Sequence, residues 1–256
     1  RLDGKGGLSA RSIRLHKNII FQTLSNAVLD KLIPFNPCER ITLPQLVKYK
    51  SKFYSQEQIA TLLSVIKDEP LYPLLKFTAV FGMRRSEVLG LTWSNVSFDN
   101  NTITISRTIT KVTKIVEKEK TKNASSHRSF PLLPELREML LELKRSESEN
   151  IKLFGKSYVK NDYIFKWPDG HTFSPDFVSQ RFSRLLEIHG MEHIRFHELR
   201  HSCASILLNM GYTLKDVQEW LGHADIKVTA DIYGHIDVAR KRGMAESLTN
   251  SLAAQS

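Results

Sequence analysis

The sequence predicts a mainly α-helical protein with one small antiparallel β-sheet. Over most of the 256 residues, apolar side chains recur every three to four positions, and prolines, glycines or cap residues mark where these stretches begin and end. After Trp93 the spacing changes to the period of two that is typical of a half-buried strand. We find no internal repeat.

The composition, 41% hydrophobic and 25% charged, is that of a globular protein and excludes a disordered or fibrous chain. No apolar run approaches the ~18 residues that a membrane span needs, and residues 1–7 lack the apolar core of a signal peptide. We therefore expect a cytoplasmic protein without a membrane partner.

Cys38 and Cys203 are far apart, which predicts neither a disulfide framework nor a thiolate zinc site. Because the first residue is Arg1, we expect a piece of a longer protein.

The positive charge is concentrated near the start of the chain. Residues 1–52 contain ten Lys or Arg and three Asp or Glu, so they carry +7 of the formal net charge of +10. A basic segment beside a nearly neutral body suggests a polyanion partner, because phosphate contacts dominate the affinity of proteins for nucleic acid. A solvated basic surface is the alternative, and charge alone favours neither.

Two helical regions are predicted on either side of a linker. Residues 8–33 form one helix with Ser9 as a candidate N-cap, and residues 34–52, with three prolines and four basic residues, fit a linker. We place a domain boundary near residue 50, which gives domains 1–50 and 51–256. Ser55 opens a second helix with a capping box, Pro73 starts a third, and Gly82 ends it in a left-handed conformation.

The strands and the remaining helices follow. Residues 102–105 alternate as a strand, and strand-like segments at 108–119 and 127–132 flank a polar turn at 121–126. Pro134 opens a helix that we expect to end near Lys144. A polar loop and a short strand come next, and the chain is helical again from residue 174. The short strand is expected at residues 163–165, and the helical region is expected to be interrupted at Gly190, Gly211 and Gly222.

The string His197-Glu198-Leu199-Arg200-His201 satisfies the H-E-x-x-H template of zinc peptidases, with Asp216 or Glu219 as a candidate third ligand. Against that interpretation, Arg200 would bring a permanent cation beside the metal. The same string places His197 and Arg200 three residues apart, on one helical face. An imidazole next to a guanidinium suits an anionic substrate, so we consider the zinc template accidental.

Other motifs accompany this pair. They are Gly82-Met83-Arg84-Arg85-Ser86-Glu87, Glu119-Lys120-Thr121-Lys122, Leu221-Gly222-His223 and Tyr233-Gly234-His235. In this order and spacing, the set resembles the catalytic domain of tyrosine recombinases, the phage and transposon integrase family, with particular likeness to integrases of conjugative transposons and temperate phages. Residues 8–45 resemble the end of that family's core-binding domain, and residues 53–256 resemble its catalytic domain.

The resemblance implies strand transfer through a covalent 3′-phosphotyrosine, with Tyr233 as the nucleophile. A free phenol has a pKa near 10, so it needs a base or a cationic setting, and His197 would provide either. Arg84 and Arg200 would stabilise the charge of the transition state with paired hydrogen bonds. Arg85 is expected to be structural or to contact DNA.

Lys120 would be the general acid that protonates the leaving 5′ oxygen, with Lys122 as the alternative. His223 would donate a hydrogen bond to the scissile phosphate, and Glu87 would orient its neighbours. No metal or nucleotide is implied, because the phosphotyrosine ester keeps the bond energy that religation uses.

The implied partner is double-stranded DNA, bound by a dimer at each site and by a tetramer on two sites, with an accessory excision factor for the mobile element. The implied location is the bacterial cytoplasm, at the nucleoid. Residues 239–252 would form a tail that docks on a neighbouring subunit or on its own. Two alternatives share the DNA partner: a type IB topoisomerase, which relaxes DNA without exchange, and a DNA-binding module that has lost its activity.

Overall fold

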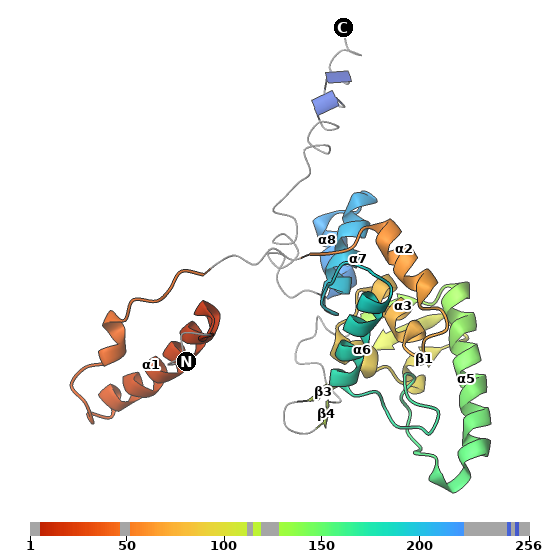
Figure 1. The fold of residues 1–256 in the computed structure, drawn as a ribbon, viewed down its shortest axis with the longest axis horizontal. Helices are drawn as coiled ribbons and strands as arrows, with labels where there is room; N and C mark the ends of the chain where they lie inside the picture. Colours follow the sequence, from red (N-terminus) through yellow and green to blue (C-terminus); the bar gives the residue numbers. More distant parts are fainter. Residues whose placement is uncertain are drawn as a thin grey trace. The chain divides into compact units, whose positions relative to one another are not determined.

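The computed structural model describes residues 6–46, 52–111, 115–118, 128–222, 245–246 and 249–250. The chain divides into two compact units, residues 1–50 and 51–256, which are called unit 1 and unit 2 below (Figure 1). As the sequence predicts, the fold is mostly helical with a small amount of antiparallel β-structure. Within the described ranges, no helix combines the length and the apolar character that crossing a membrane requires.

Unit 1 consists of helix α1 (Ala10–Leu29) and the short 3-10 helix η1 (Pro37–Arg40). The Ser9 side chain accepts a hydrogen bond from the Ser12 amide at 3.1 Å, which confirms the N-cap. The helix ends four residues earlier than predicted, and Lys31 just beyond it has a positive φ of 57°.

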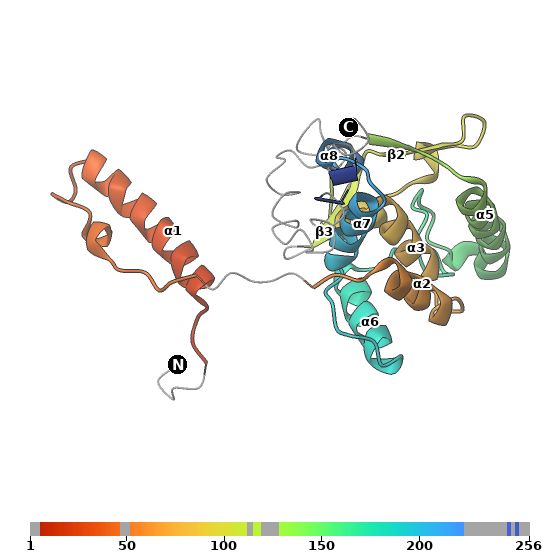
Figure 2. The same ribbon diagram turned by 90° about the horizontal axis from the view of Figure 1, so that it is seen from above.

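The sequence predicts a simple linker after α1, but the first part of this segment folds back onto the helix. The Asn36 side chain is buried and donates hydrogen bonds to the Phe21 carbonyl oxygen at 2.9 Å and to the Ser25 hydroxyl at 2.8 Å. Figure 2 shows this return along α1. The linker interpretation is therefore wrong for residues 36–40. The hydrogen bonds of Asn36 to α1 hold this segment against the helix, and residues 37–40 form η1.

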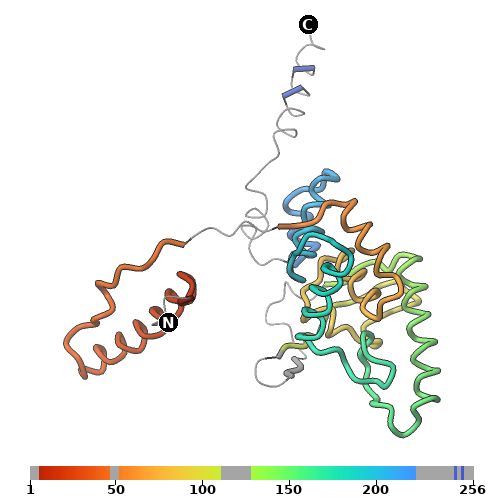
Figure 3. Tube along the Cα trace, in the orientation of Figure 1, coloured from red at the N-terminus to blue at the C-terminus, as the bar shows by residue number. Residues whose placement is uncertain are grey.

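The helical core of unit 2 contains α2 (Gln56–Val65), α3 (Tyr72–Phe81), α6 (Pro175–Ile188), α7 (Glu198–Asn209) and α8 (Leu214–Leu221). The Ser55 capping box opens α2 as predicted, and α3 packs against α7 with Leu74, Phe77 and Phe81 fully buried. Figures 1 and 3 show α7 and α8 on one side of unit 2 and α5 (Pro134–Phe154) on the other.

The β-structure forms two small sheets where the sequence predicted one. Strands β1 (Val96–Ser97), β2 (Thr102–Ile105) and β5 (Arg128–Pro131) pair antiparallel in that order, and Ile105 lies opposite Arg128. Strands β3 (Thr108–Lys111) and β4 (Ile115–Lys118) form a separate antiparallel pair. The strand-like segment predicted at 108–119 is thus a hairpin, because folding back lets the backbone groups of each half pair with those of the other.

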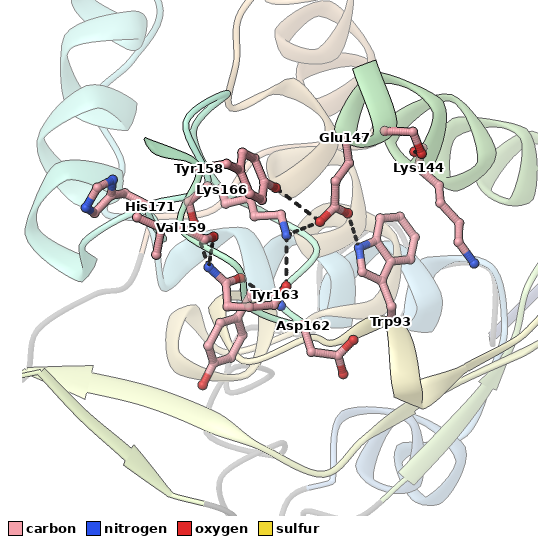
Figure 4. Close-up of polar contacts among 12 residues, drawn as sticks. Trp93, Lys144, Glu147, Tyr158, Val159, Asp162, Tyr163, Lys166 and His171 are labelled. Carbon is pink, nitrogen blue, oxygen red and sulfur yellow. Dashed lines mark hydrogen bonds and ion pairs between the residues drawn. The ribbon is translucent and has the colours of Figure 1, made fainter. Parts of the chain in front are cut away.

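Helix α5 is longer than predicted: it continues past Lys144 to Phe154 and leads into the 3-10 helix η4 (Gly155–Ser157). Glu147 in the added turns accepts hydrogen bonds from Trp93 Nε1 at 2.6 Å, from the Tyr158 hydroxyl at 3.1 Å and from Lys166 (Figure 4). These tertiary contacts stabilise the polar second half of α5 as a helix, although the spacing of its apolar residues predicts a loop there.

Lys166 is 5% exposed and lies next to the segment where we expected a strand at 163–165. That segment forms only isolated bridges, between Thr92 and Tyr163 and between Lys166 and Thr172, so the strand prediction is wrong. The helix interruptions at Gly190, Gly211 and Gly222 are confirmed, and all three glycines have positive φ.

Candidate active site

The turn between α3 and α4 (Arg85–Leu89) places Arg84. Gly82 ends α3 with φ 60° and ψ 33°, the left-handed conformation that favours glycine. A Cβ atom at this position would lie 2.2 Å from Leu221 Cδ2, so the absence of a side chain also lets α8 pack against the turn. Arg84 then serves as the N-terminal cap residue of α4, and its side chain is 34% exposed.

Glu87 is a buried carboxylate bound by arginines from three parts of the chain, and its side chain is 2% exposed. Arg84 Nη1 lies 2.5 Å from Oε1, Arg128 Nη2 lies 3.0 Å from Oε2, and Arg200 Nη1 lies 3.8 Å from Oε2. Burial alone would raise the pKa of Glu87, but the charges of Arg128 and Arg84 hold the pKa below its usual value. The carboxylate is ionised and joins α4, β5 and α7.

Arg200 is fully buried and ties the α3–α4 turn to the end of α8. Its Nη1 donates to the Gly82 carbonyl oxygen at 2.7 Å, and its Nη2 donates to the Leu221 carbonyl oxygen at 2.6 Å. Burial, together with the charge of Arg84, lowers the pKa of Arg200 to about 9, while the charge of Glu87 opposes this shift. The guanidinium therefore remains charged at neutral pH.

His197 is the N-cap residue of α7 and lines a cleft of about 660 Å³ together with Arg84, Ser86, Ile109, Phe182 and Ile194. Desolvation, followed by the charges of His201, Arg200 and Arg84, lowers the pKa of His197 to about 4. The imidazole is thus neutral at pH 7, which leaves one ring nitrogen able to accept a proton.

The structure brings together four of the predicted residues: Arg84, Glu87, His197 and Arg200. The carbonyl oxygen of Gly222 accepts a hydrogen bond of 3.5 Å from Arg84 Nη2, so the chain reaches the site at the residue before His223. The other predicted residues, namely Lys120, Lys122, His223, Tyr233 and the tail 239–252, lie outside the described residues apart from 245–246 and 249–250.

Arg85 lines the same cleft as Arg84 but has different hydrogen-bond partners. Arg85 Nη1 donates to the Pro175 carbonyl oxygen at 3.0 Å and to the Ser179 hydroxyl, so it fastens α4 to α6. These contacts fit a structural role, and the position of Arg85 in the cleft also fits a contact with DNA, so both alternatives stay predictions.

Arg128 was missed by the sequence analysis. It is 9% exposed and makes two hydrogen bonds to Glu87, at 3.0 and 3.4 Å. The available signal was the strand alternation: Phe130 is an inward residue, and residue 128 shares its face. An arginine on an inward face needs a buried anionic partner.

The zinc-peptidase interpretation does not agree with the described contacts. Glu198 accepts hydrogen bonds from the Arg195 amide and guanidinium at 2.5 and 3.1 Å. Asp216 caps α8 through Thr213, and Glu219 pairs with Lys215 at 3.4 Å. In the parts of the chain that the structure describes, no three His, Cys, Asp or Glu side chains are grouped to hold a metal ion.

Comparison with known proteins decides the family. Residues 52–240, more than half of the chain, match the model of the phage integrase family. The chain belongs to the phage integrase family. The resemblance to tyrosine recombinases inferred from the four motifs and the His197–Arg200 pair is therefore confirmed.

Among relatives of this phage integrase family member, a "Tyrosine recombinase XerC-like" protein of Caldanaerobacter subterraneus subsp. tengcongensis is 29% identical over 95% of this chain and 67% of its own length. The ICEBs1 integrase of Bacillus subtilis is 27% identical over 96% of this chain and 67% of its own length. Both alignments extend into unit 1.

Solved structures show that the fold is that of integrases. The Tn1549 transposon integrase, in complex with a circular intermediate DNA, superposes with a TM-score of 0.76 at 21% identity, covering 94% of this chain and 80% of that chain. A lambda integrase dimer bound to a core site superposes with a TM-score of 0.64 at 15% identity, covering 87% and 59% of the two chains.

Proposed function

We propose that this phage integrase family member is a site-specific DNA recombinase that cuts and rejoins DNA strands through a covalent 3′-phosphotyrosine. The observation that carries the proposal is the Glu87 carboxylate, which gathers Arg84 and Arg200 beside a cleft lined by His197. Arg84 and His197 line this cleft, and the buried Arg200 lies 3.8 Å from the same carboxylate. An exposed guanidinium, an imidazole and a second positive charge behind them suit the phosphate of a DNA backbone.

The nucleophile of this reaction is Tyr233. Its hydroxyl attacks the phosphorus, the bond to the 5′ oxygen breaks, and the DNA 3′ phosphate becomes esterified to the tyrosine. A neutral His197 accepts the phenolic proton or binds the phosphate as a hydrogen-bond donor, since its lowered pKa leaves it unprotonated at neutral pH.

The arginines stabilise the negative charge that the transition state spreads over the non-bridging oxygens. Arg84 is partly exposed and donates to one of these oxygens, while the buried Arg200 acts at short range and fixes the turn that carries Arg84. A fixed charge that is shielded from water stabilises the transition state strongly, because solvent does not screen it and the protein does not need to reorganise during the reaction.

Lys120 protonates the leaving 5′ oxygen, with Lys122 as the alternative, and His223 donates a hydrogen bond to the scissile phosphate. Religation reverses these steps, with a 5′ hydroxyl as the attacking group. No metal, nucleotide or other cofactor takes part, because the tyrosine ester conserves the energy of the broken bond.

In its biological setting, the enzyme would integrate and excise a mobile element in the bacterial cytoplasm. Residues 1–50 would form the C-terminal part of a helical core-binding domain, and residues 51–256 would form the catalytic domain with its tail. A dimer would bind each double-stranded DNA site and a tetramer would join two sites, with an accessory excision factor. The ICEBs1, phage L54a and Tn1549 integrases among the similar proteins support this setting.

A plasmid that carries two copies of the joined element ends tests the function. Incubation without ATP or divalent metal is expected to yield two separate circles, and Tyr233→Phe is expected to yield none. Relaxation of the supercoiled plasmid without exchange would support the topoisomerase alternative instead.

A further inference from the structure

We propose that Arg128 is a positioning residue of the recombinase site. It holds the Glu87 carboxylate in the orientation in which Glu87 binds Arg84. Glu87 in turn directs the Arg84 guanidinium toward the DNA phosphate. The inference rests on the function proposed above and adds to it a residue that none of the motifs contains.

The contacts of Arg128 support a fixed position. Its Nη1 and Nη2 bind different oxygens of Glu87, at 3.4 and 3.0 Å, so the carboxylate plane is constrained from one side. The guanidinium carbon lies 5.4 Å from the centre of the Phe130 ring, two residues along the same strand. Pairing of residue 128 with Ile105 holds the backbone of β5 in the sheet.

Glu87 engages Arg84 at two points, the backbone amide at 2.9 Å and the guanidinium at 2.5 Å. Since both oxygens of the carboxylate take part, rotation of the carboxylate would break one contact. Arg128 approaches from β5 and opposes that rotation. Three arginines around one carboxylate also leave an excess of positive charge, which a bound phosphate would balance.

The charged groups that face Glu87 are Arg84 from its own helix, Arg128 from β5 and Arg200 from α7. Burial raises the pKa of Glu87, and the charge of Arg128 makes the largest opposing contribution. Replacing Arg128 by a neutral residue would therefore raise the pKa of this buried carboxyl. A protonated Glu87 would bind Arg84 only weakly.

A structural ion pair would stabilise the fold without influencing the reaction, so the test needs a measurement that distinguishes the two roles. We would measure single-turnover cleavage of a nicked DNA between pH 5.5 and 9 for Arg128→Gln, Arg128→Lys, Glu87→Gln and Arg128→Gln/Glu87→Gln. Arg184→Gln is the control, because Arg184 is exposed and pairs with Glu187 on its own helix. Melting temperatures would show which variants are folded at the assay temperature.

We expect Arg128→Gln to lose about 10- to 100-fold in cleavage rate near pH 6, by analogy with the loss found when the hydrogen-bond partner that orients a metal ligand is removed. The rate should recover as the pH rises and Glu87 ionises. Arg128→Lys should restore much of the rate at pH 6, since it keeps the charge. The double variant should cleave no more slowly than Glu87→Gln and should lack the recovery. A lower melting temperature with an unchanged rate profile would refute the proposal.

A second measurement separates this inference from the proposed function. Carbon-13 NMR of carboxyl-labelled glutamate, with the Glu87 signal assigned by its loss in Glu87→Gln, would follow the ionisation of Glu87 directly. We expect its pKa to be higher in Arg128→Gln than in the wild type, and an unchanged pKa would refute the inference. If the wild type cleaves no DNA, the proposed function fails, and this titration alone decides the influence of Arg128 on Glu87.

Discussion

Arg200 donates a hydrogen bond of 2.7 Å to the carbonyl oxygen of Gly82, a residue 118 positions earlier in the chain. The other terminal nitrogen of the same guanidinium binds the carbonyl oxygen of Leu221. One buried side chain thus connects the turn that carries Arg84 with the segment that leads to His223. The relationship explains how residues so far apart in the sequence come to lie at one place.

Arg200→Ala is expected to lower the free energy of unfolding by about 3 kcal/mol, because two buried carbonyl groups lose their donor and Glu87 loses a cation. Urea unfolding measures the change. The exposed Arg184→Ala is the matched control, and it should change the free energy by less than about 0.5 kcal/mol. Equal effects of the two substitutions would argue against a structural role for the Arg200 contacts.

Gly82→Ala tests the close approach of α8 to the turn. A left-handed conformation costs a non-glycine residue about 1 kcal/mol, and the contact of Cβ with Leu221 would add about 1–3 kcal/mol through overpacking. Gly190→Ala is the matched control, since Gly190 has φ 61° but no atom within 4 Å of a Cβ. Thermal unfolding should therefore show a distinctly larger loss for Gly82→Ala, and similar losses would exclude the contact.

The lowered pKa of His197 predicts a loss of stability in mild acid. The unfolded state binds a proton near pH 6.5, whereas the folded state binds it only near pH 4. The stabilising effect of the neutral ring is complete above pH 6.5 and decreases as the pH falls toward 4. The pKa of His201 is lowered too, first by burial, so both rings contribute.

The measurement is the free energy of unfolding between pH 4.5 and 7.5. His197→Gln should make the decrease toward low pH shallower, and His197→Gln/His201→Gln should make it shallower still. A slope identical to that of the wild type would show that His197 titrates alike in the folded and unfolded states.

The charge of unit 1 predicts a strong salt dependence of DNA binding. Arg11, Lys31 and Arg40 are exposed, and replacing them by Gln should reduce the slope of log K against log salt by about 0.9 for each phosphate that the protein no longer neutralises. Lys152, Lys156 and Lys160, at and beyond the C-terminal end of α5, provide a control of equal charge on unit 2 (Figure 1). Equal slopes for both triple variants would mean that unit 1 has no special role in binding phosphates.

Local signals predicted much of the fold. Ser9 and Ser55 cap helices as their hydroxyls suggest, and Gly82 and Gly222 end helices in the left-handed conformation. The errors occur where distant contacts decide the structure. Glu147 stabilises the second half of α5 through Trp93, Tyr158 and Lys166, and no periodicity within the helix reports those partners.

The candidate site shows the same division. Sequence motifs predicted Arg84, Glu87, His197 and Arg200 as site residues, because each stands in a short string with a chemical meaning, and the structure places the four close together. They did not identify Arg128, whose role depends on a strand that places it beside a carboxylate 41 positions earlier. The sequence does not predict the burial of Arg200 either. A guanidinium is buried only where hydrogen-bond acceptors are available, and its acceptor, the Gly82 carbonyl oxygen, lies far away in the sequence.

The most direct test of the account uses a nicked suicide DNA substrate, which loses a short fragment on cleavage and so traps the enzyme on the strand. Denaturing electrophoresis would detect the adduct, and peptide mapping would locate it. The account predicts an adduct on Tyr233 that forms without metal or nucleotide, is absent in Tyr233→Phe, and is about 100-fold slower to form when Arg84 is replaced by Ala. An adduct on another residue, or undiminished cleavage by Tyr233→Phe, would contradict it.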